Sequence, residues 1–106
     1  MWAVTGNDIT MTEGDFGVQL PIKINGATFS ANDSVLFTLK TEMNGTTLLE
    51  LPFTNIAQNT INLELTEAQS TALKTGTYIY SLDWYQNSLF LCNIIPSAIF
   101  RVVDKA

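Results

Sequence analysis

The sequence predicts an all-β sandwich of about seven to eight short antiparallel strands, with one short helical turn at about residues 66–74. Apolar and polar residues alternate along most of the chain, as they do in strands that bury one face. Gly, Asn and Pro separate these segments at near-regular spacing, which is typical of a sandwich. With 106 residues, the chain has the size of one domain, and we expect a single domain over residues 1–106.

Eight segments have strand character. They cover residues 9–11, 15–24, 34–42, 46–53, 60–65, 77–85, 89–95 and 98–103. In 15–24 the alternation places Phe16 inward with Val18, Leu20, Ile22 and Ile24. Pro21 lies on the other face of this strand, and because proline donates no ladder hydrogen bond, we expect an edge position or a local bulge there. Asn44-Gly45 predicts a hairpin turn between the third and fourth segments.

The stretch 66–76 predicts the one helical turn. Thr66 is a candidate N-cap and Gln69 follows it three residues later, as in a capping box. Gly76 is expected to end the helix as a C′ glycine. No helix is long enough to form a crossover between parallel strands, so we expect the sheets to be antiparallel.

The strand 77–85 places Tyr78, Tyr80, Leu82 and Trp84 on one face. In immunoglobulin-like sandwiches a tyrosine at this corner hydrogen-bonds back to the backbone a few residues upstream. We therefore expect an immunoglobulin-like sandwich in which Tyr78 is the corner tyrosine and Tyr80 occupies the position of the cysteine in antibody domains. The alternative is that the two tyrosines are ordinary core aromatics.

Composition and charge argue against several functions. The net charge is −5 and the five basic residues are dispersed, so we expect no binding to nucleic acid or to an anionic membrane surface. The chain has no histidine, which is the commonest general base and transition-metal ligand. No catalytic or zinc-ligand motif is present, so we expect neither an enzyme nor a cofactor or metal site.

Cys92 is the only cysteine, so an intramolecular disulfide cannot form. We expect it to pack as a small apolar residue within the run 89–95. The first ten residues lack the pattern of a signal peptide, and no apolar run reaches the ~20 residues of a membrane span. We expect a protein made and folded in a reducing cytoplasm.

An excess of apolar residues indicates an interaction surface. The run 89–95 is apolar on both faces, whereas a two-layer sandwich covers one face of each sheet. We expect an interface with another subunit on the outer face of the sheet that contains 77–95. Its candidate residues are Ile79, Tyr85, Leu89, Phe90, Leu91 and Ile95. An alternative for Tyr85 and Phe90 is a platform on which a sugar stacks.

Four stretches carry a resemblance that covers nearly the whole chain. They are ITMTEGDFGVQLPIKING, ANDSVLFTLKTE, TINLELTEAQSTALKTGTYIYSLDWY and AIFRVVDKA. The chain resembles the small immunoglobulin-like domains of phage virion proteins, in particular the N-terminal domain of baseplate upper proteins in phages of Gram-positive hosts, and related prophage tail or head-decoration proteins. The shared pattern includes Leu-Thr-x-x-x-Ser/Thr-x-x-Leu-x-x-Gly-x-Tyr-x-Tyr, which here runs from Leu65 to Tyr80.

The resemblance implies a non-enzymatic structural or adaptor part of a virion. Such a protein would be made in the cytoplasm of a bacterial host and would assemble with other virion proteins or with itself. It transfers no catalytic residues to this chain. The alternative function is a module that binds carbohydrate or another surface through Tyr85 and Phe90.

Overall fold

The computed structural model describes residues 3–5, 7–17, 20–24, 29–42, 45–54, 56 and 59–104. Within them the chain forms strands β1 (Ala3–Thr5), β2 (Asp8–Thr12), β3 (Leu20–Lys23), β4 (Asp33–Lys40), β5 (Thr47–Thr54), β6 (Thr60–Leu63), β7 (Gly76–Gln86) and β8 (Leu89–Val103), with helix α1 (Glu67–Thr71) between β6 and β7. The predicted all-β fold with one short helix is confirmed. β1 is an addition to the predicted elements.

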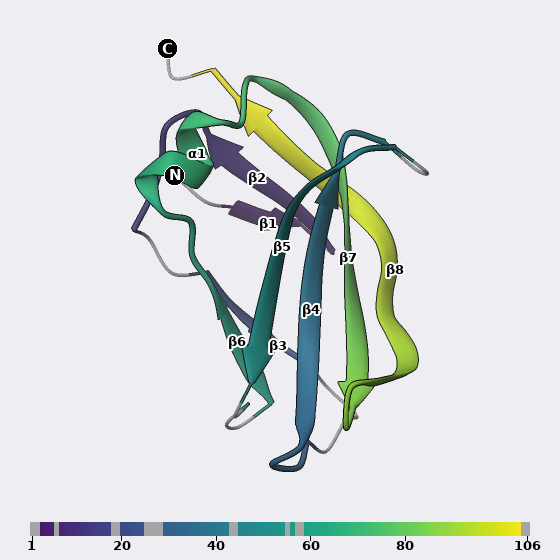
Figure 1. The fold of residues 1–106 in the computed structure, drawn as a ribbon. Helices are drawn as coiled ribbons and strands as arrows, with labels where there is room; N and C mark the ends of the chain where they lie inside the picture. The colour runs from purple at the N-terminus through teal and green to yellow at the C-terminus, as the bar shows by residue number, and fades with distance from the viewer. Residues whose placement is uncertain are drawn as a thin grey trace.

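The strands form two sheets that face each other as a sandwich (Figure 1). The larger sheet has the order β1-β2-β8-β7-β4-β5, and the smaller one pairs β3 with β6. Strands three and six of the chain therefore share one sheet, while four, seven and eight are neighbours in the other. Immunoglobulin-like sandwiches divide their strands in the same way, with B and E in one sheet and C, F and G in the other.

One pair of strands departs from the predicted antiparallel arrangement. β2 pairs with the end of β8 in parallel, from Ile9 opposite Phe100 to Thr12 opposite Val103. Parallel neighbours need a long connection between them, and here most of the chain lies between the two strands, so no crossover helix is required. The backbone N–H of Ile99 also donates to Asp8 Oδ1 at 3.2 Å, which fixes β2 against β8.

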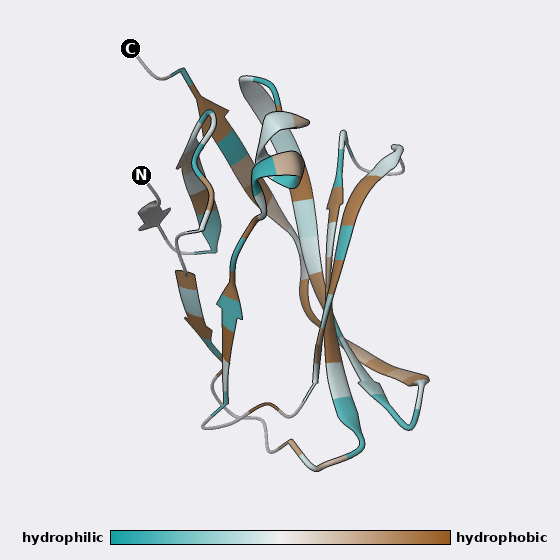
Figure 2. Cartoon of the chain, turned by 60° about the vertical axis from the view of Figure 1, so that its left-hand side comes forward, coloured by the Kyte–Doolittle hydropathy of each residue, from teal (hydrophilic) through white to brown (hydrophobic). Residues whose placement is uncertain are grey.

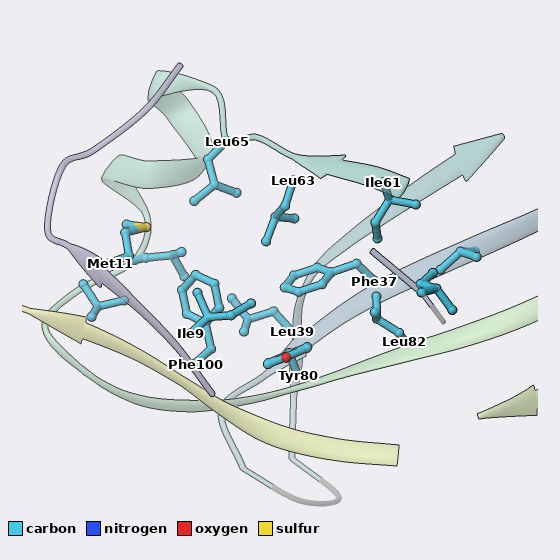
Figure 3. Packing of buried hydrophobic residues seen from close by; sticks show 14 residues of the cluster. Ile9, Met11, Phe37, Leu39, Ile61, Leu63, Leu65, Tyr80, Leu82 and Phe100 are labelled. Atoms are coloured by element: carbon cyan, nitrogen blue, oxygen red, sulfur yellow. The ribbon is translucent and has the colours of Figure 1, made fainter. Parts of the chain in front are cut away.

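The core is built from the inward faces of both sheets and from the corner around α1 (Figure 3). Its buried residues are Ile9, Met11, Ile24, Val35, Phe37, Leu39, Ile61, Leu63, Leu65, Leu73, Tyr80, Leu82, Phe100 and Val102. Phe37 lies at the centre, stacked on Tyr80 with ring centroids 5.3 Å apart and edge-on to Phe100 at 6.2 Å. Such aromatic pairs add to the stabilisation from burial alone.

Tyr80 is 2% exposed, and its hydroxyl donates to the backbone carbonyl of Asn7. Burial, together with the nearby Asp8 carboxylate, raises the pKa of Tyr80 to about 12. Tyr80, which we expected at the position that a cysteine occupies in antibody domains, therefore joins β7 to the segment before β2 through a hydrogen bond.

The corner between β6 and β7 forms as the sequence predicts at its start. The Thr66 side chain accepts from the backbone N–H of Gln69 at 3.2 Å, and Gln69 Oε1 accepts from the backbone N–H of Thr66 at 2.9 Å. This is a capping box. The Tyr78 hydroxyl donates to the carbonyl of Lys74 at 2.6 Å, so Tyr78 makes the hydrogen bond of a tyrosine corner.

Gly76 does not have the expected role at the end of the helix. The helix ends at Thr71 with Ala72 as its C-cap, and Gly76 is the first residue of β7. A C′ glycine adopts a positive φ, and among the described glycines only Gly14 and Gly17 do so. The prediction was wrong because the helix is shorter than the polar stretch from which it was inferred.

Phe16 is also placed differently from the prediction. It lies four residues before β3 and is 48% exposed, whereas Leu20 and Ile22 are half-buried on the inner face. Gly17 follows with a φ of 73°, which takes the chain out of extended geometry and ends the alternation before it reaches Phe16. Val18 lies outside the described residues, and so does the Asn44 of the predicted Asn-Gly turn. Pro21 lies in a two-stranded sheet, where both strands are edges.

Candidate interaction surface at the β7–β8 hairpin

β7 and β8 form one long hairpin, which ends at the opposite end of the molecule from α1 (Figure 1). Its two-residue turn is Asn87-Ser88, with φ of 51° and 66°. Positive φ at both central residues defines the type I′ turn, whose twist matches that of the flanking strands. The Asn87 N–H donates to the Asn32 carbonyl at 3.1 Å, so the turn is anchored to the segment before β4.

β8 is one continuous strand through Pro96, where the sequence predicts a break between two strands. The ladder pairs Gly76–Gln86, which is 11 residues, with Leu89–Val102, which is 14. The three additional residues enter at three shifts of register, each of which is a bulge on β8. Bulges increase local twist, and in Figure 1 the first half of β8 curves away from the sheet.

The bulges change which side chains of β8 share a face. Tyr85 is paired with Phe90, and the adjacent Trp84 is paired with Cys92, so Phe90 and Cys92 lie on opposite faces. The sequence predicts the same face for these two residues, because alternation assumes that no residue is inserted between them. Leu91 is the inserted residue. Cys92 is exposed rather than packed, which corrects the expectation of a buried thiol.

Three consecutive apolar side chains are exposed at the start of β8. Leu89 is 72% exposed, Phe90 56% and Leu91 48%. The Tyr85 ring lies against the Phe90 ring on the outer face, edge to face with centroids 5.8 Å apart. In Figure 2 the first half of β8 is coloured as hydrophobic, and the end of the hairpin turns away from the two-stranded sheet. We call Leu89, Phe90 and Leu91 the hairpin tip.

The six candidate interface residues do not share one face. Ile79 is half-buried on the outer face opposite Ile99, next to the Lys40 position of β4. Ile95 is paired with Leu82 and therefore points to the core side, where it packs against the buried cluster. The structure thus brings Tyr85 and Phe90 together on the outer face. Leu89 is paired with Gln86 on the opposite face at the same end of the hairpin, and Ile79 and Ile95 lie apart from this end.

The hairpin tip lies within the longest stretch of the sequence that has no charged residue. From Trp84 to Phe100 no residue is charged, and Asp83 and Arg101 flank this run. Asp83 accepts a hydrogen bond from the side chain of its cross-strand partner Asn93. The tip is therefore a neutral apolar area on a molecule with a net charge of −5.

A polar hollow of about 420 Å³ adjoins the same end of the sheet. Its lining is Ala31, Asn32, Asp33, Ser34, Thr54, Asn87 and Ser88. Ser34, which lines the hollow, is the cross-strand neighbour of Tyr85, and Tyr85 is the cross-strand neighbour of Phe90. The hollow and the Tyr85–Phe90 ring pair are therefore adjacent on the outer face. Asp33 is 2% exposed, and its carboxylate accepts from the Ser30 backbone N–H at 3.0 Å and from the Ser30 hydroxyl at 3.1 Å. The Ser30 backbone hydrogen bond is the main cause that lowers the pKa of Asp33.

A second hollow, apolar and of about 310 Å³, lies between α1 and the start of β5. Its lining is Leu48, Leu49, Ala68, Gln69, Ala72 and Leu73. The sequence does not predict this hollow, because Leu48 is an additional residue at a register shift between β4 and β5, and alternation does not reveal such a shift. Leu48 is 45% exposed and belongs to the start of β5, and this end of β5 lies at the other end of the molecule from the β7–β8 turn (Figure 1).

The described residues contain no group of three or more His, Cys, Asp or Glu side chains that could hold a metal ion. In the same part of the chain, no helix has the length and apolar character needed to cross a membrane. The surface chemistry that the structure does provide is apolar at the hairpin tip and hydroxyl- and amide-rich in the hollow beside it.

Comparison of the chain with protein-family models gave no match, and comparisons with curated proteins and with solved structures gave none either. The fold and the surface therefore define the class to which the molecule belongs, an all-β sandwich domain with an exposed apolar hairpin.

Proposed function

We propose that this protein is a non-enzymatic structural part of a phage or prophage virion, either a tail or baseplate adaptor or a head-decoration subunit. In this proposal the hairpin tip is the surface through which it assembles with other protein. The protein is made in the cytoplasm of the bacterial host and functions in the virion.

The observation that carries the proposal is the exposure of three adjacent large apolar side chains, Leu89, Phe90 and Leu91. Phe90 lies on the outer face with Tyr85, Leu89 lies on the opposite face with Gln86, and Leu91 lies at the bulge beside them, so the exposed side chains surround the end of the hairpin. Clustered apolar side chains of this kind mark interaction sites, whereas single exposed apolar residues are ordinary. The resemblance of the Leu65–Tyr80 pattern to phage virion domains supports the choice of a virion among assemblies. In this chain the pattern builds the corner, with Leu65, Ser70 and Leu73 buried and Tyr78 bonded to Lys74.

The test is the presence of the protein in particles. Induced phage particles from the bacterium that carries the gene are banded by density and analysed by quantitative mass spectrometry. We expect the chain to co-purify with capsid or tail proteins in a fixed copy number per particle. Its recovery only in the soluble fraction of the lysate would contradict the proposal.

A pair of matched variants links incorporation to the surface. Leu89→Glu places a charge in the hairpin tip, while Leu48→Glu places the same charge on another exposed leucine, at the start of β5. We expect Leu89→Glu to reduce incorporation at least tenfold and Leu48→Glu to leave it unchanged. Equal incorporation of both variants would show that the tip is not the assembly surface.

A second candidate function is carbohydrate binding, which the arrangement beside the tip supports. The half-exposed Phe90 ring lies next to Tyr85, and the adjoining hollow presents the amide and hydroxyl groups of Asn32, Ser34 and Asn87. Sugars bind to such combinations of an aromatic face with convergent polar groups. Under this alternative, a glycan array would give a signal that Tyr85→Ala abolishes without loss of fold. A blank array with the native protein would dismiss it.

A further inference from the structure

We propose that the hairpin tip is covered by a second copy of this chain, related to the first by a two-fold axis. Leu89, Phe90 and Leu91 of one copy would pack against the same residues of the other. The inference deepens the proposed function and rests on it, since it names the partner of the surface through which the protein assembles.

The first argument is where apolar side chains are exposed. Five large ones are exposed among the described residues. Phe16 and Leu48 are isolated from each other in the chain, whereas the other three are consecutive on β8. By the register, Phe90 points to the outer face and Leu89 to the opposite face, so the exposed side chains surround the end of the hairpin, where a partner that meets the hairpin end-on can cover them.

The second argument is charge. Each copy carries a net charge of −5, so two copies repel each other over most approaches. The run from Trp84 to Phe100 carries no charge, and the tip lies within it. Two copies that meet at their tips bring neutral surface onto neutral surface, whereas a strongly basic partner would find no carboxylate within this run. The chemistry of the tip thus fits a copy of itself.

The third argument is the geometry of the strand. β8 pairs with β2 only through Phe100–Val103, so along 89–97 the edge away from β7 faces no described strand. A contact about a two-fold axis places the same patch on both partners, and a strand edge can satisfy this antiparallel to its own copy. The bulges of β8 limit continuous pairing. We therefore expect side-chain packing at the tip, with backbone pairing confined to the few residues between bulges.

The size of the patch determines the strength of the association. The three side chains expose on the order of 300 Å² per copy, whereas a standard interface buries about 800 Å² per partner. We expect a dimer that dissociates on dilution and that becomes persistent when many copies are held together in an assembly.

Cys92 gives the interface a built-in reporter. It is exposed and follows Leu91 directly, so a two-fold axis near Leu91 brings the two Cys92 thiols close together. A short bis-maleimide added to the native protein at high concentration should link two copies through Cys92. Cys92→Ser should remove the product, and dilution should reduce it.

The decisive experiment is sedimentation velocity over a hundredfold range of concentration, carried out on the native protein and on two variants. We expect a monomer–dimer equilibrium for the native protein and for Leu48→Glu, and for Leu89→Glu a dissociation constant at least tenfold higher. Circular dichroism and the unfolding midpoint confirm that both variants are folded.

Three outcomes would overturn the inference. They are a native protein that is monomeric throughout, a dimer that Leu89→Glu leaves intact, and a dimer that Leu48→Glu disrupts equally. Particle analysis separates this failure from failure of the proposed function. If the protein is monomeric but is incorporated into virions through its tip, only the proposal of a second copy as partner is contradicted. If the protein is absent from virions, the proposed function is contradicted.

Discussion

At the scale of single residues, Tyr78 and Tyr80 lie two positions apart on one face of β7 and have different roles. Tyr80 is buried against Phe37 of β4, and its hydroxyl donates to the Asn7 carbonyl, so it connects β7 both to β4 and to the segment before β2. Tyr78 is half-buried and its hydroxyl reaches back only to Lys74. Alternation predicts that both face inward, but it does not distinguish the core aromatic from the corner aromatic.

The corner hydrogen bond gives the first prediction. Tyr78→Phe keeps the ring and removes the hydroxyl that donates to Lys74 at 2.6 Å, so the free energy of unfolding should fall by about 1 kcal/mol. Urea denaturation measures the change. Tyr85→Phe is the matched control, because the Tyr85 hydroxyl makes no hydrogen bond to the residues that the structure describes. Equal effects of the two substitutions would show that the Tyr78 bond does not stabilise the corner.

The buried carboxylate of Asp33 gives a prediction of pH dependence. Its hydrogen bonds from Ser30 lower its pKa in the folded protein below the ordinary value of 3.8. The folded state therefore keeps Asp33 ionised at a pH at which the unfolded chain binds a proton. The stability that this residue contributes is present above about pH 4 and is lost as the pH falls through the folded pKa.

Asp33→Asn isolates this contribution. The difference in unfolding free energy between the native protein and Asp33→Asn should be largest near neutral pH and should shrink as the pH falls below about 4. Denaturant titrations at several pH values measure it. A difference that stays constant down to about pH 2 would mean that the carboxylate is not held ionised by its hydrogen bonds.

At the scale of elements, the hairpin turn offers a substitution that should stabilise the protein. Ser88 has a φ of 66°, a conformation that glycine adopts at lower cost. Ser88→Gly should raise the free energy of unfolding by roughly 0.5–1 kcal/mol, since Asn-Gly is the preferred type I′ pair. Ser97→Gly, at an exposed position of β8 without positive φ, should instead lower it. In thermal unfolding, the midpoint temperature should rise for Ser88→Gly and fall for Ser97→Gly.

Elements with clear alternation could be predicted from the sequence. In β4, Val35, Phe37 and Leu39 are fully buried as expected, and in β6 so are Ile61 and Leu63. The local pattern also determined the capping box, because its hydrogen bonds join residues only three apart. In these places one local rule decides the structure, and packing of the two sheets agrees with it.

The candidate surface could be predicted only in part, because its shape depends on register. The run 89–95 is apolar at nearly every position, so no alternation specifies which residues face the core. The bulges then place Leu91 outside the pairing and turn Ile95 toward Leu82. The parallel pairing of β2 with β8 is a contact between distant parts of the chain, which no local pattern reports.

At the scale of the whole molecule, the two sheets depend on one shared core. Phe37 on β4 belongs to the six-stranded sheet and Leu63 on β6 to the two-stranded sheet, and both are 0% exposed in the same cluster. A two-stranded sheet is only marginally stable by itself in water. The smaller sheet should therefore be stable only while it packs on the larger one, and the described strands should unfold as one cooperative unit.

Two cavity-forming variants test this cooperativity. Phe37→Ala should lower the unfolding free energy by about 3–5 kcal/mol and Leu63→Ala by about 2–5 kcal/mol, because each leaves a void in the same core. Both should shift a single transition that tryptophan fluorescence and far-ultraviolet circular dichroism report at the same urea concentration. Phe16→Ala, at a ring that is 48% exposed, should change stability by less than about 0.5 kcal/mol. If fluorescence and circular dichroism gave different urea midpoints for Leu63→Ala, the small sheet would unfold independently of the large one. The shared core would then not be what holds the sandwich together.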